Sequence, residues 1–356
     1  MNALHRQPTP CAGQAGLTLI EIMIAMTISL VLLAGVIQIF VSNKQTYRMQ
    51  EAASQIQEGG RFAVQMMNHD LRMAGYFGCS SLVTSPTNQV DLDGDGIADS
   101  MADFTGNGLQ GFEYSDLPIV ISNTQTLTTA DVLPNTDIIS IARGEDMGIR
   151  LAGSLSSVNA NIQLDAALAA GRFQANDILL ISDCVEGDVF AANNVSNGSG
   201  TITIAHSSAV NTGSFLSKAY GPDAEVMALV NHIYYIGTGS SGQPALFRYA
   251  LGSNGVMTAA EELVEGVEDI QITYGEDTDG DRTANIYVDA DAVGDMSQVV
   301  SIRIDFTLRS LEDNITASAS ASASASASAS ASASASGDRR LRRSFSSTTT
   351  IRNRVQ

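Results

Sequence analysis

Positive charge is scarce in this chain, and the shortage narrows what the protein can do. Its 356 residues include 19 Lys or Arg but 38 Asp or Glu, which gives a formal net charge of -19 at pH 7. A surface of that sign repels phosphates, so nucleic acid is not expected as a general direct partner. The local exception is a group of arginines near the C-terminus: Arg339, Arg340, Arg342, Arg343, Arg352 and Arg354. They could contact DNA or a protein, but we favour solvated strand faces that offset the acidic body.

Histidine and catalytic motifs are also scarce. The four histidines are His5, His69, His206 and His232. The sequence contains no His-Glu-x-x-His zinc motif, no Gly-x-Ser-x-Gly nucleophile turn and no phosphate-binding loop. His232 lies in a strand pattern and is expected to be a packed or edge histidine rather than a metal ligand. The sequence therefore predicts no enzyme.

Only three cysteines are present, and one apolar run separates them. Cys11 precedes the run, whereas Cys79 and Cys184 follow it. If the body after the run is exported, Cys79 and Cys184 are its only possible intramolecular pair, and a disulfide closing so long a loop adds up to about 4 kcal/mol. The alternative is two separate buried thiols.

The apolar run covers residues 17–41, which matches the roughly 20 residues that cross a hydrocarbon core. The 16 residues before it lack the apolar core of a secretory signal, and no small-x-small cleavage pattern follows Val41. The pattern predicts one membrane-spanning anchor followed by a soluble body.

A carboxylate, Glu21, interrupts this run. In a bilayer a charged side chain costs about 2.5 kcal/mol or more at a helix centre, so such residues usually mark a paired functional site. Its natural partner is a cation at the same depth. The alternative is a carboxyl near the helix end that reaches back to the lipid headgroups.

Gly16, followed by Leu17-Thr18-Leu19-Ile20-Glu21 and an apolar helix, resembles the prepilin signature of type IV pilins and type II secretion pseudopilins. The resemblance implies that a membrane peptidase cuts after Gly16 and methylates the amino group of Leu17. It also implies that Glu21 neutralises the new amino terminus of a neighbouring subunit and sets its axial register. Leu17 is a departure from the phenylalanine that is commoner at this position.

The helical pattern continues beyond the apolar run. Small and apolar residues recur at three- and four-residue steps, the period of one helical face: Ala53, Ile56, Gly60, Ala63, Met67, Leu71 and Ala74. An amphipathic helix is therefore expected over residues 42–78. The pair Gly59 and Gly60 weakens a helix by about 1 kcal/mol per glycine and indicates a bend or a close helix contact.

Three motifs resemble the PilW-type minor pilins of the type IV pilus: Gln-Thr-Tyr-Arg from Gln45, Gly-Arg-Phe-Ala from Gly60 and Leu-Arg-x-Ala-Gly-Tyr-x-Gly-Cys from Leu71. Residues 263–275 also resemble that family and, more loosely, the J-type pseudopilins. The resemblance implies an α+β, type IV pilin-like fold, in which a long N-terminal helix with a membrane-embedded first half packs on an antiparallel β-sheet head.

The expected organisation is a prepilin leader peptide over residues 1–16, a transmembrane and filament-core helix over 17–41, the amphipathic helix over 42–78 and a β-rich head over 79–356. Strands are expected at residues 118–122, 137–142, 177–183, 201–205, 226–236, 245–250 and 298–310. Ten Ala-Ser repeats at 317–336 carry too little apolar surface to fold and predict a flexible loop. That loop is expected to expand a hairpin between the strand at 298–310 and a C-terminal strand.

Two acidic stretches have the spacing of calcium loops. In the first, the candidate ligands are Asp91, Asp93, Asp95 and Asp99. Gly96 stands where the chain must turn, but Ala102 replaces the bidentate glutamate. In the second, the candidate ligands are Asp277, Asp279, Asp281 and Asn285. Arg282 replaces the glycine there and weakens the match. Calcium is thus the one candidate cofactor, and solvated acidic turns are the alternative.

The function that the resemblance implies is that of a minor pilin, processed by prepilin peptidase, that helps initiate assembly at or near the pilus tip. Its expected partners are other minor pilins, the major pilin, the peptidase, the inner-membrane assembly machinery and, before assembly, membrane lipid. Its expected location is the bacterial inner membrane with a periplasmic head, then the extracellular pilus. The alternatives are a J-type pseudopilin of type II secretion and a membrane-anchored calcium-dependent adhesin.

Overall fold

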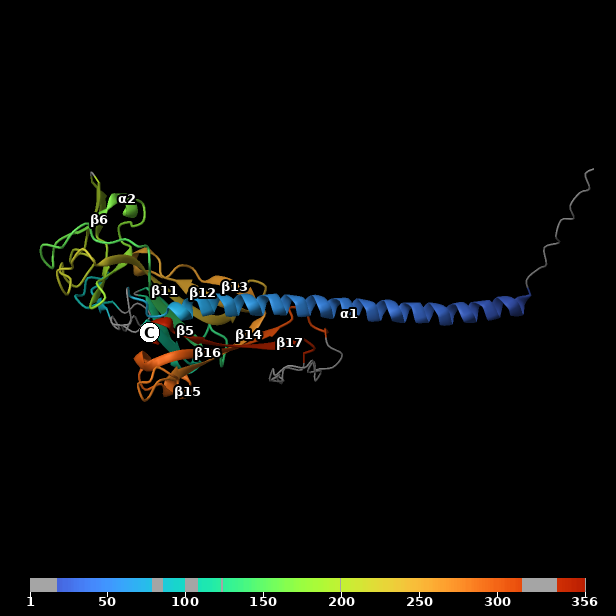
Figure 1. Cartoon of the computed structure of the whole chain (residues 1–356). Coiled ribbons are helices and arrows are strands. Elements are labelled where there is room, and N and C mark those ends of the chain that lie inside the picture. Colours follow the sequence, from blue (N-terminus) through green and yellow to red (C-terminus); the bar gives the residue numbers. More distant parts are fainter. Residues whose placement is uncertain are drawn as a thin grey trace, which may run out of the picture. The chain divides into compact units, whose positions relative to one another are not determined.

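The computed structural model describes residues 18–78, 86–99, 108–122, 124–198, 200–315 and 338–355. The chain divides into two compact units, Met1–Glu51 and Ala52–Gln356. One helix, α1 (Leu19–Met73), belongs to both (Figure 1). The boundary between the units therefore falls inside the helix.

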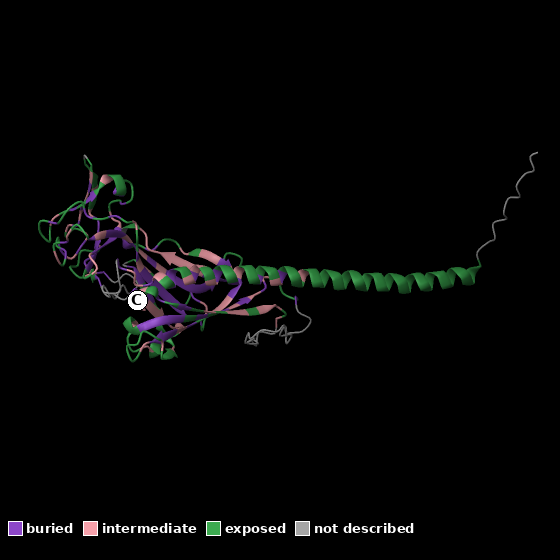
Figure 2. Ribbon diagram, in the orientation of Figure 1, coloured by how far each residue is buried: buried purple, intermediate pink, exposed green. Residues whose placement is uncertain are grey.

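The two parts of α1 bury very different surfaces. In the first unit nearly every described side chain is exposed, which fits a run of Leu, Ile, Met and Val that needs another apolar surface or lipid to cover it (Figure 2). In the second unit one helical face is buried, and its residues recur at three- and four-residue steps: Ala52, Ile56, Gly60, Ala63, Met67, Asp70 and Leu71. This confirms the amphipathic pattern and adds a buried carboxylate to it.

The helix ends earlier than residue 78, where the sequence placed its end. Gly75 adopts a φ of 67°, a left-handed conformation that terminates helices. The Gly75 N–H then donates to the Ala142 carbonyl at 3.0 Å, and the chain leaves the helix axis. At the pair Gly59 and Gly60, by contrast, the helix is uninterrupted. A Cβ on Gly60 would collide with the Phe345 ring, so this glycine permits close approach of a strand rather than of another helix.

The part of the head that the structure describes contains four sheets rather than one. In the largest, the strands lie in the order β1 (Thr87–Asn88), β8 (Gly187–Ala191), β7 (Ile178–Ser182), β11 (Glu225–Thr238), β12 (Pro244–Ala250) and β13 (Glu261–Glu265). Two more strands join it through β11, namely β5 (Ile138–Glu145) and β2 (Leu109–Phe112). All the pairings in this sheet are antiparallel except the one between β1 and β8.

The second sheet has the order β15 (Ile286–Val288), β14 (Val267–Glu276), β16 (Val299–Arg309) and β17 (Arg342–Thr350). Smaller sheets are formed by β6 (Ile162–Asp165), β10 (Thr201–Ala205) and β9 (Asn194–Asn197), and by β3 (Ile119–Ser122) with β4 (Gln125–Leu127). Short helices are α2 (Ala166–Ala169), η1 (Tyr114–Asp116), η2 (Ser253–Gly255), η3 (Ala290–Ala292), η4 (Met296–Gln298) and η5 (Arg352–Arg354). Each strand that the sequence predicted is present.

The predicted hairpin is also present. Strands β16 and β17 pair antiparallel, with Phe306 opposite Phe345, and the Ala-Ser repeats between them lie outside the described residues. Along β16, Ile304 and Phe306 are buried whereas Arg303 and Asp305 are exposed, as the alternation of the sequence requires.

The main core lies where the second part of α1 meets the two large sheets. Met67 and Leu71 of α1 pack in one cluster with Tyr234 of β11 and with Ile272 and Phe306 of the four-stranded sheet. Each fully buried side chain of this size contributes roughly 1.5–3 kcal/mol. The pilin-like α+β architecture therefore depends on the helix, because it covers apolar faces of both sheets.

The sequence suggested that the C-terminal arginines lie on solvated strand faces. In the structure, this is not true of all of them. Arg342 forms ion pairs with Glu268 and Asp338, and its Nε lies 2.7 Å from a Glu268 oxygen. Half-buried Arg354 donates from Nη1 to the Val299 carbonyl at 2.7 Å, and burial lowers its pKa to about 10. These guanidinium groups join elements of the head, because buried carbonyls and carboxylates need donors.

Candidate assembly site

Glu21 lies in the first turn of α1. Its Oε2 accepts hydrogen bonds from the N–H and the hydroxyl of Thr18, both at 3.4 Å, and the Glu21 N–H donates to the Thr18 hydroxyl at 3.4 Å. This reciprocal arrangement resembles a capping box and holds the carboxylate at the end of the helix where negative charge is favoured. Gly16 and Leu17, the predicted processing residues, lie outside the described residues.

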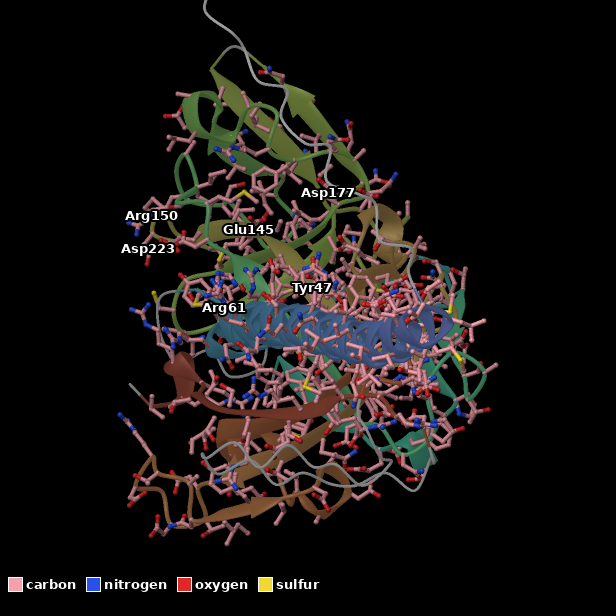
Figure 3. The ribbon with its side chains drawn as sticks, turned by 90° about the vertical axis from the view of Figure 1, so that its right-hand side faces the viewer. Tyr47, Arg61, Glu145, Arg150, Asp177 and Asp223 are labelled. Atoms are coloured by element: carbon pink, nitrogen blue, oxygen red, sulfur yellow. The ribbon has the colours of Figure 1, made fainter. Side chains whose placement is uncertain are left out.

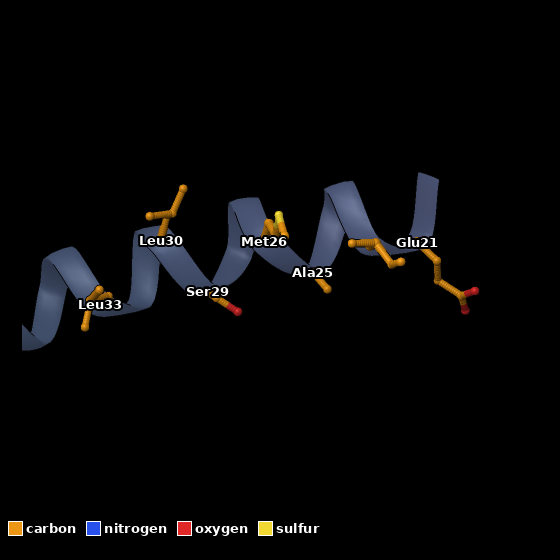
Figure 4. Close-up of a pocket in the computed structure, with 7 residues that line it drawn as sticks. Glu21, Ala25, Met26, Ser29, Leu30 and Leu33 are labelled. Carbon is orange, nitrogen blue, oxygen red and sulfur yellow. The ribbon is translucent and has the colours of Figure 1, made fainter. Parts of the chain in front are cut away.

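A shallow groove follows Glu21 along the helix. Ala25, Ser29 and Leu33 succeed it at four-residue steps, and Glu21, Ala25 and Ser29 point to the same side of the ribbon (Figure 4). Small residues at such steps allow the backbone of a second helix to approach closely. The helix is also long and apolar enough to cross a membrane. The surface thus combines a carboxylate with a close-packing stripe.

The first acidic loop brings three of its four predicted ligands together. Carboxylate oxygens of Asp91, Asp93 and Asp99 lie within 4.8 Å of one another. Asp91 also accepts the backbone N–H groups of Gly94 at 2.8 Å and Gly96 at 2.9 Å. Asp95 is not in this group, and Ala102 lies outside the described residues. Three carboxylates without histidine or cysteine suit a hard cation such as calcium.

The second acidic loop has the same local conformation. Asp277 accepts the N–H groups of Gly280 and Arg282, three and five residues ahead, both at 2.7 Å, as Asp91 does in the first loop. Arg282 adopts a φ of 68°, so it takes the left-handed conformation that glycine adopts in the other loop. Asp277, Asp279 and Asp281 are brought together, whereas the Asn285 side chain accepts the N–H of Thr278 instead.

Calcium binding stays a prediction for both loops. We expect calcium to raise the free energy of unfolding of the full chain, by about 2.7 kcal/mol when its free concentration is 100 times the dissociation constant. Urea unfolding with calcium or with EDTA measures this difference. Asp91→Asn should remove most of it, while the matched variant Asp277→Asn, in the loop with the weaker match, should retain most of it. An effect that survives Asp91→Asn would contradict assignment to the first loop.

Cys184 is disulfide-bonded and adopts a φ of 75°. Cys11 and Cys79 lie outside the described residues, so the pairing of Cys184 with Cys79 remains a prediction. One described contact supports it. A Cβ on Gly78 would lie 3.2 Å from the hydroxyl of Ser182, which brings the segment before Cys79 close to the segment before Cys184.

A buried polar cluster, missed by the sequence reasoning, joins the last turns of α1 to the central strand. Asp70 Oδ2 accepts the Tyr234 hydroxyl at 2.6 Å and lies 2.5 Å from His232 Nδ1, while Arg143 lies 3.7 Å from Oδ1. Burial alone would raise the pKa of Asp70, but the bonds from His232 and Tyr234 and the Arg143 charge hold it well below its usual value. His232 is thus a packed histidine that pairs with a carboxylate.

A second buried cluster joins the two large sheets. Asp137, just before β5, accepts the Ile272 N–H of β14 at 2.6 Å. Burial and the adjacent, hydrogen-bonded carboxyl of Glu113 raise the pKa of Asp137 to about 8. The Tyr274 hydroxyl lies fully buried nearby. Burial raises its pKa well above the usual value, and Asp137 and Glu113 raise it further. At neutral pH the raised pKa favours the protonated form of Asp137.

This proton makes the stability of the head depend on pH. Because the pKa of Asp137 is higher in the folded chain than its usual 3.8, its contribution is complete below pH 4 and is lost as pH rises through 8. Asparagine mimics the protonated acid, so Asp137→Asn should match the wild type near pH 4 and become increasingly more stable than it as pH rises towards 8, by up to about 1.4 kcal/mol per pH unit. Urea unfolding between pH 5 and 9 measures this, with exposed Asp305→Asn as the control. Parallel curves for wild type and Asp137→Asn would refute it.

Two family models match the chain, and they agree with this geometry. The prokaryotic N-terminal methylation motif matches residues 11–37, which include Glu21 and the start of α1. This match and the β-rich head are consistent with a type IV pilin-like α+β chain, whose N-terminal helix is long and apolar enough to cross a membrane. The model of the type IV pilus-assembly protein W, PilW, matches residues 233–353, from within β11 into η5. Over these residues the chain is similar to the PilW family of the type IV pilus. No curated protein and no solved structure gives a significant match.

Proposed function

We propose that this protein is a minor pilin, cut after Gly16 by prepilin peptidase and incorporated at or near the tip of a type IV pilus, where it helps to initiate assembly. One observation carries the proposal: a methylation motif and a PilW-matching head occur in the same chain. Helix α1 begins within the methylation motif, and its last turns pack against the sheets of the PilW-matching head. Pilin-related families are structural, and the proposed role needs no bond-making chemistry by this chain.

The groove that begins at Glu21 supports an assembly mechanism. Cleavage after Gly16 would create an amino group, with an ordinary pKa of about 7.7–8.0, at Leu17. In a filament of packed helices, that cation on a neighbouring subunit would neutralise Glu21 and offset the cost of burying a carboxylate, about 2.5 kcal/mol or more. Ala25 and Ser29 would permit close helix packing beside the ion pair. Register and packing would thus be set by the same surface.

The domain organisation and location follow as parts of the proposal. Residues 1–16 would be removed as the leader, residues 17–41 would lie in the inner membrane and then in the filament core, and the head would be periplasmic before assembly and extracellular afterwards. Other minor pilins, the major pilin, the peptidase and the inner-membrane machinery would be the partners. The two acidic loops would offer candidate carboxylate ligands for calcium.

Intact-mass and N-terminal analysis of the protein from native membranes tests the proposal, with and without the prepilin peptidase. We expect a chain that starts at Leu17 and carries a methyl group on its amine only when the peptidase is present. Retention of residues 1–16 in its presence would contradict the proposal and favour the calcium-dependent adhesin. A J-type pseudopilin would also be processed, so gene neighbours of the pilus or of the secretion type separate those two.

A further inference from the structure

The terminal strands of the sheets in the described head differ sharply in length. β1, β15, β6, β9 and β13 have 2, 3, 4, 4 and 5 residues. By contrast, β17 has nine residues and is an edge strand of the four-stranded sheet. Proteins usually protect edge strands by shortness, proline, bulges or charge, because an open edge pairs with other chains. β13 carries three glutamates, whereas the last seven residues of β17 are uncharged serine, threonine and phenylalanine.

The register of the hairpin shows which backbone groups of β17 face outward. At its two ends, Ser310 N–H donates to the Leu341 carbonyl at 2.8 Å and Ile351 N–H donates to the Val300 carbonyl at 2.9 Å. In an antiparallel ladder alternate residues bond the neighbouring strand, so the odd-numbered residues of β17 bond β16. The even-numbered residues therefore direct N–H and C=O away from it.

Three of these outward residues are Ser346, Thr348 and Thr350. All three side chains are exposed. Their backbone groups make no hydrogen bonds to other backbone groups of the described chain on the side away from β16. The open edge is therefore a row of three residues that can each donate and accept in a sheet.

Exposed arginines flank this row. Arg343 lies on β17 and Arg352 lies just beyond it. Strand β17 lies beside α1 in the head (Figure 1). On α1, Asn68 Nδ2 donates to the Ser347 hydroxyl at 2.9 Å, so the helix face that carries Asn68 is turned towards β17. Arg61, labelled on α1 in Figure 3, is seven residues before Asn68, and Arg72 is four residues after it, which places both on that face.

These arginines are unusual in a chain of net charge -19. Arg61, Arg72, Arg343 and Arg352 form no ion pair within 4.0 Å among the described residues, whereas Arg309, Arg340 and Arg342 do. The acid in register with this edge is Asp305, opposite Ser346 and on the sheet face turned away from α1. Arginines without an ion-pair partner within 4.0 Å among the described residues therefore gather along the side of β17 that faces the helix.

We propose that this arginine-flanked edge, defined as Ser346, Thr348 and Thr350 with Arg61, Arg72, Arg343 and Arg352, binds an extended acidic segment of another pilin subunit. That segment adds to the four-stranded sheet as a strand next to β17. Backbone hydrogen bonds supply the affinity, and the arginines select an acidic sequence and exclude a basic one. DNA would satisfy the arginines but not the row of sheet-forming N–H and C=O groups. The inference rests on the proposed pilin function and names the chemistry of the partner.

The test uses the full chain in native membranes that contain the other pilin subunits, with a photo-crosslinking residue at Ser346. We expect an adduct whose crosslinked peptide, identified by mass spectrometry, is an acidic segment of another pilin. Thr348→Pro removes an outward N–H without breaking the ladder to β16 and should lower the yield about tenfold. The matched variant Thr348→Ala keeps that N–H and should leave the yield unchanged. Arg61→Glu with Arg343→Glu should also lower it about tenfold.

Three results would overturn the inference: no pilin adduct at Ser346, an adduct with DNA alone, or a pilin adduct whose yield is the same in Thr348→Pro. Mass analysis of Leu17 in the same sample keeps this outcome separate from the proposed function. A chain that starts at Leu17 but gives no adduct refutes the strand-binding edge and leaves the pilin assignment intact. A chain that retains residues 1–16 refutes the pilin assignment itself.

Discussion

Asp70→Ala is expected to reduce the free energy of unfolding of the head by about 3–5 kcal/mol, because it removes one partner of a buried ion pair. The substitution leaves His232 and the Tyr234 hydroxyl, which Asp70 bonds at 2.5 and 2.6 Å, without their acceptor. It also removes the link between the last turns of α1 and the central strand β11. Urea unfolding of the full chain in detergent micelles measures the loss.

His69→Ala provides the matched control. The His69 side chain, next to Asp70 in the sequence, is 73% exposed, so its loss should change the free energy of unfolding by no more than about 0.5 kcal/mol. The pH dependence gives a second measurement. The pKa of Asp70 is lowered in the folded chain, so its contribution is present above its usual pKa and is lost as pH falls below about 4. Asp70→Asn should remove that acid-dependent part. A loss below 1 kcal/mol for Asp70→Ala would show that the cluster does not hold the helix to the sheet.

Glu21→Ala is expected to reduce the amount of this protein in sheared pili by more than tenfold, while N-terminal processing at Leu17 continues. The reason is that the proposed neutralisation of a neighbour's amino terminus needs a carboxylate at this depth, and alanine leaves that cation in lipid or protein without a partner. Immunoblotting of pilus and membrane fractions measures incorporation, and mass analysis measures processing.

Glu58→Ala is the matched control, because Glu58 is an exposed acid on the same helix but lies in the head unit. It should leave incorporation unchanged. Glu21→Gln keeps the size and polarity of the side chain but not its charge, so it should behave like Glu21→Ala if charge is what matters. Normal incorporation of Glu21→Gln would show that Glu21 acts through hydrogen bonding or not at all.

Local chemistry made much of the fold predictable. The apolar run and the three- and four-residue steps after it predicted α1, since helix periodicity is a property of neighbouring residues. Alternation in β16 predicted which of its faces is buried, and the hairpin with β17 was predicted across the Ala-Ser repeats. The division into four sheets was not predicted, because strand partners distant in sequence are chosen by packing.

The candidate sites divide in the same way. The spacing of acids identified both loops, and the structure brings three carboxylates together in each. It did not identify Asp70, although an acid on the apolar face of the helix and the alternating His232 and Tyr234 were the available signals. Their meeting depends on a separation of more than 160 residues, which local patterns do not encode. Glu113 and Asp137 are much closer in sequence, but they meet only because β2 pairs with β5.

By itself, the sequence determined the anchor helix, its carboxylate at Glu21, the β-rich head and the pilin-like class, because each depends on residue types within one continuous segment. Only the tertiary structure decided where α1 ends, how Gly60 admits Phe345, and which edge of the head stays open. These features depend on register and packing between distant segments. A one-residue change in pairing would turn the outward groups of Ser346, Thr348 and Thr350 inward, and no local pattern fixes that choice.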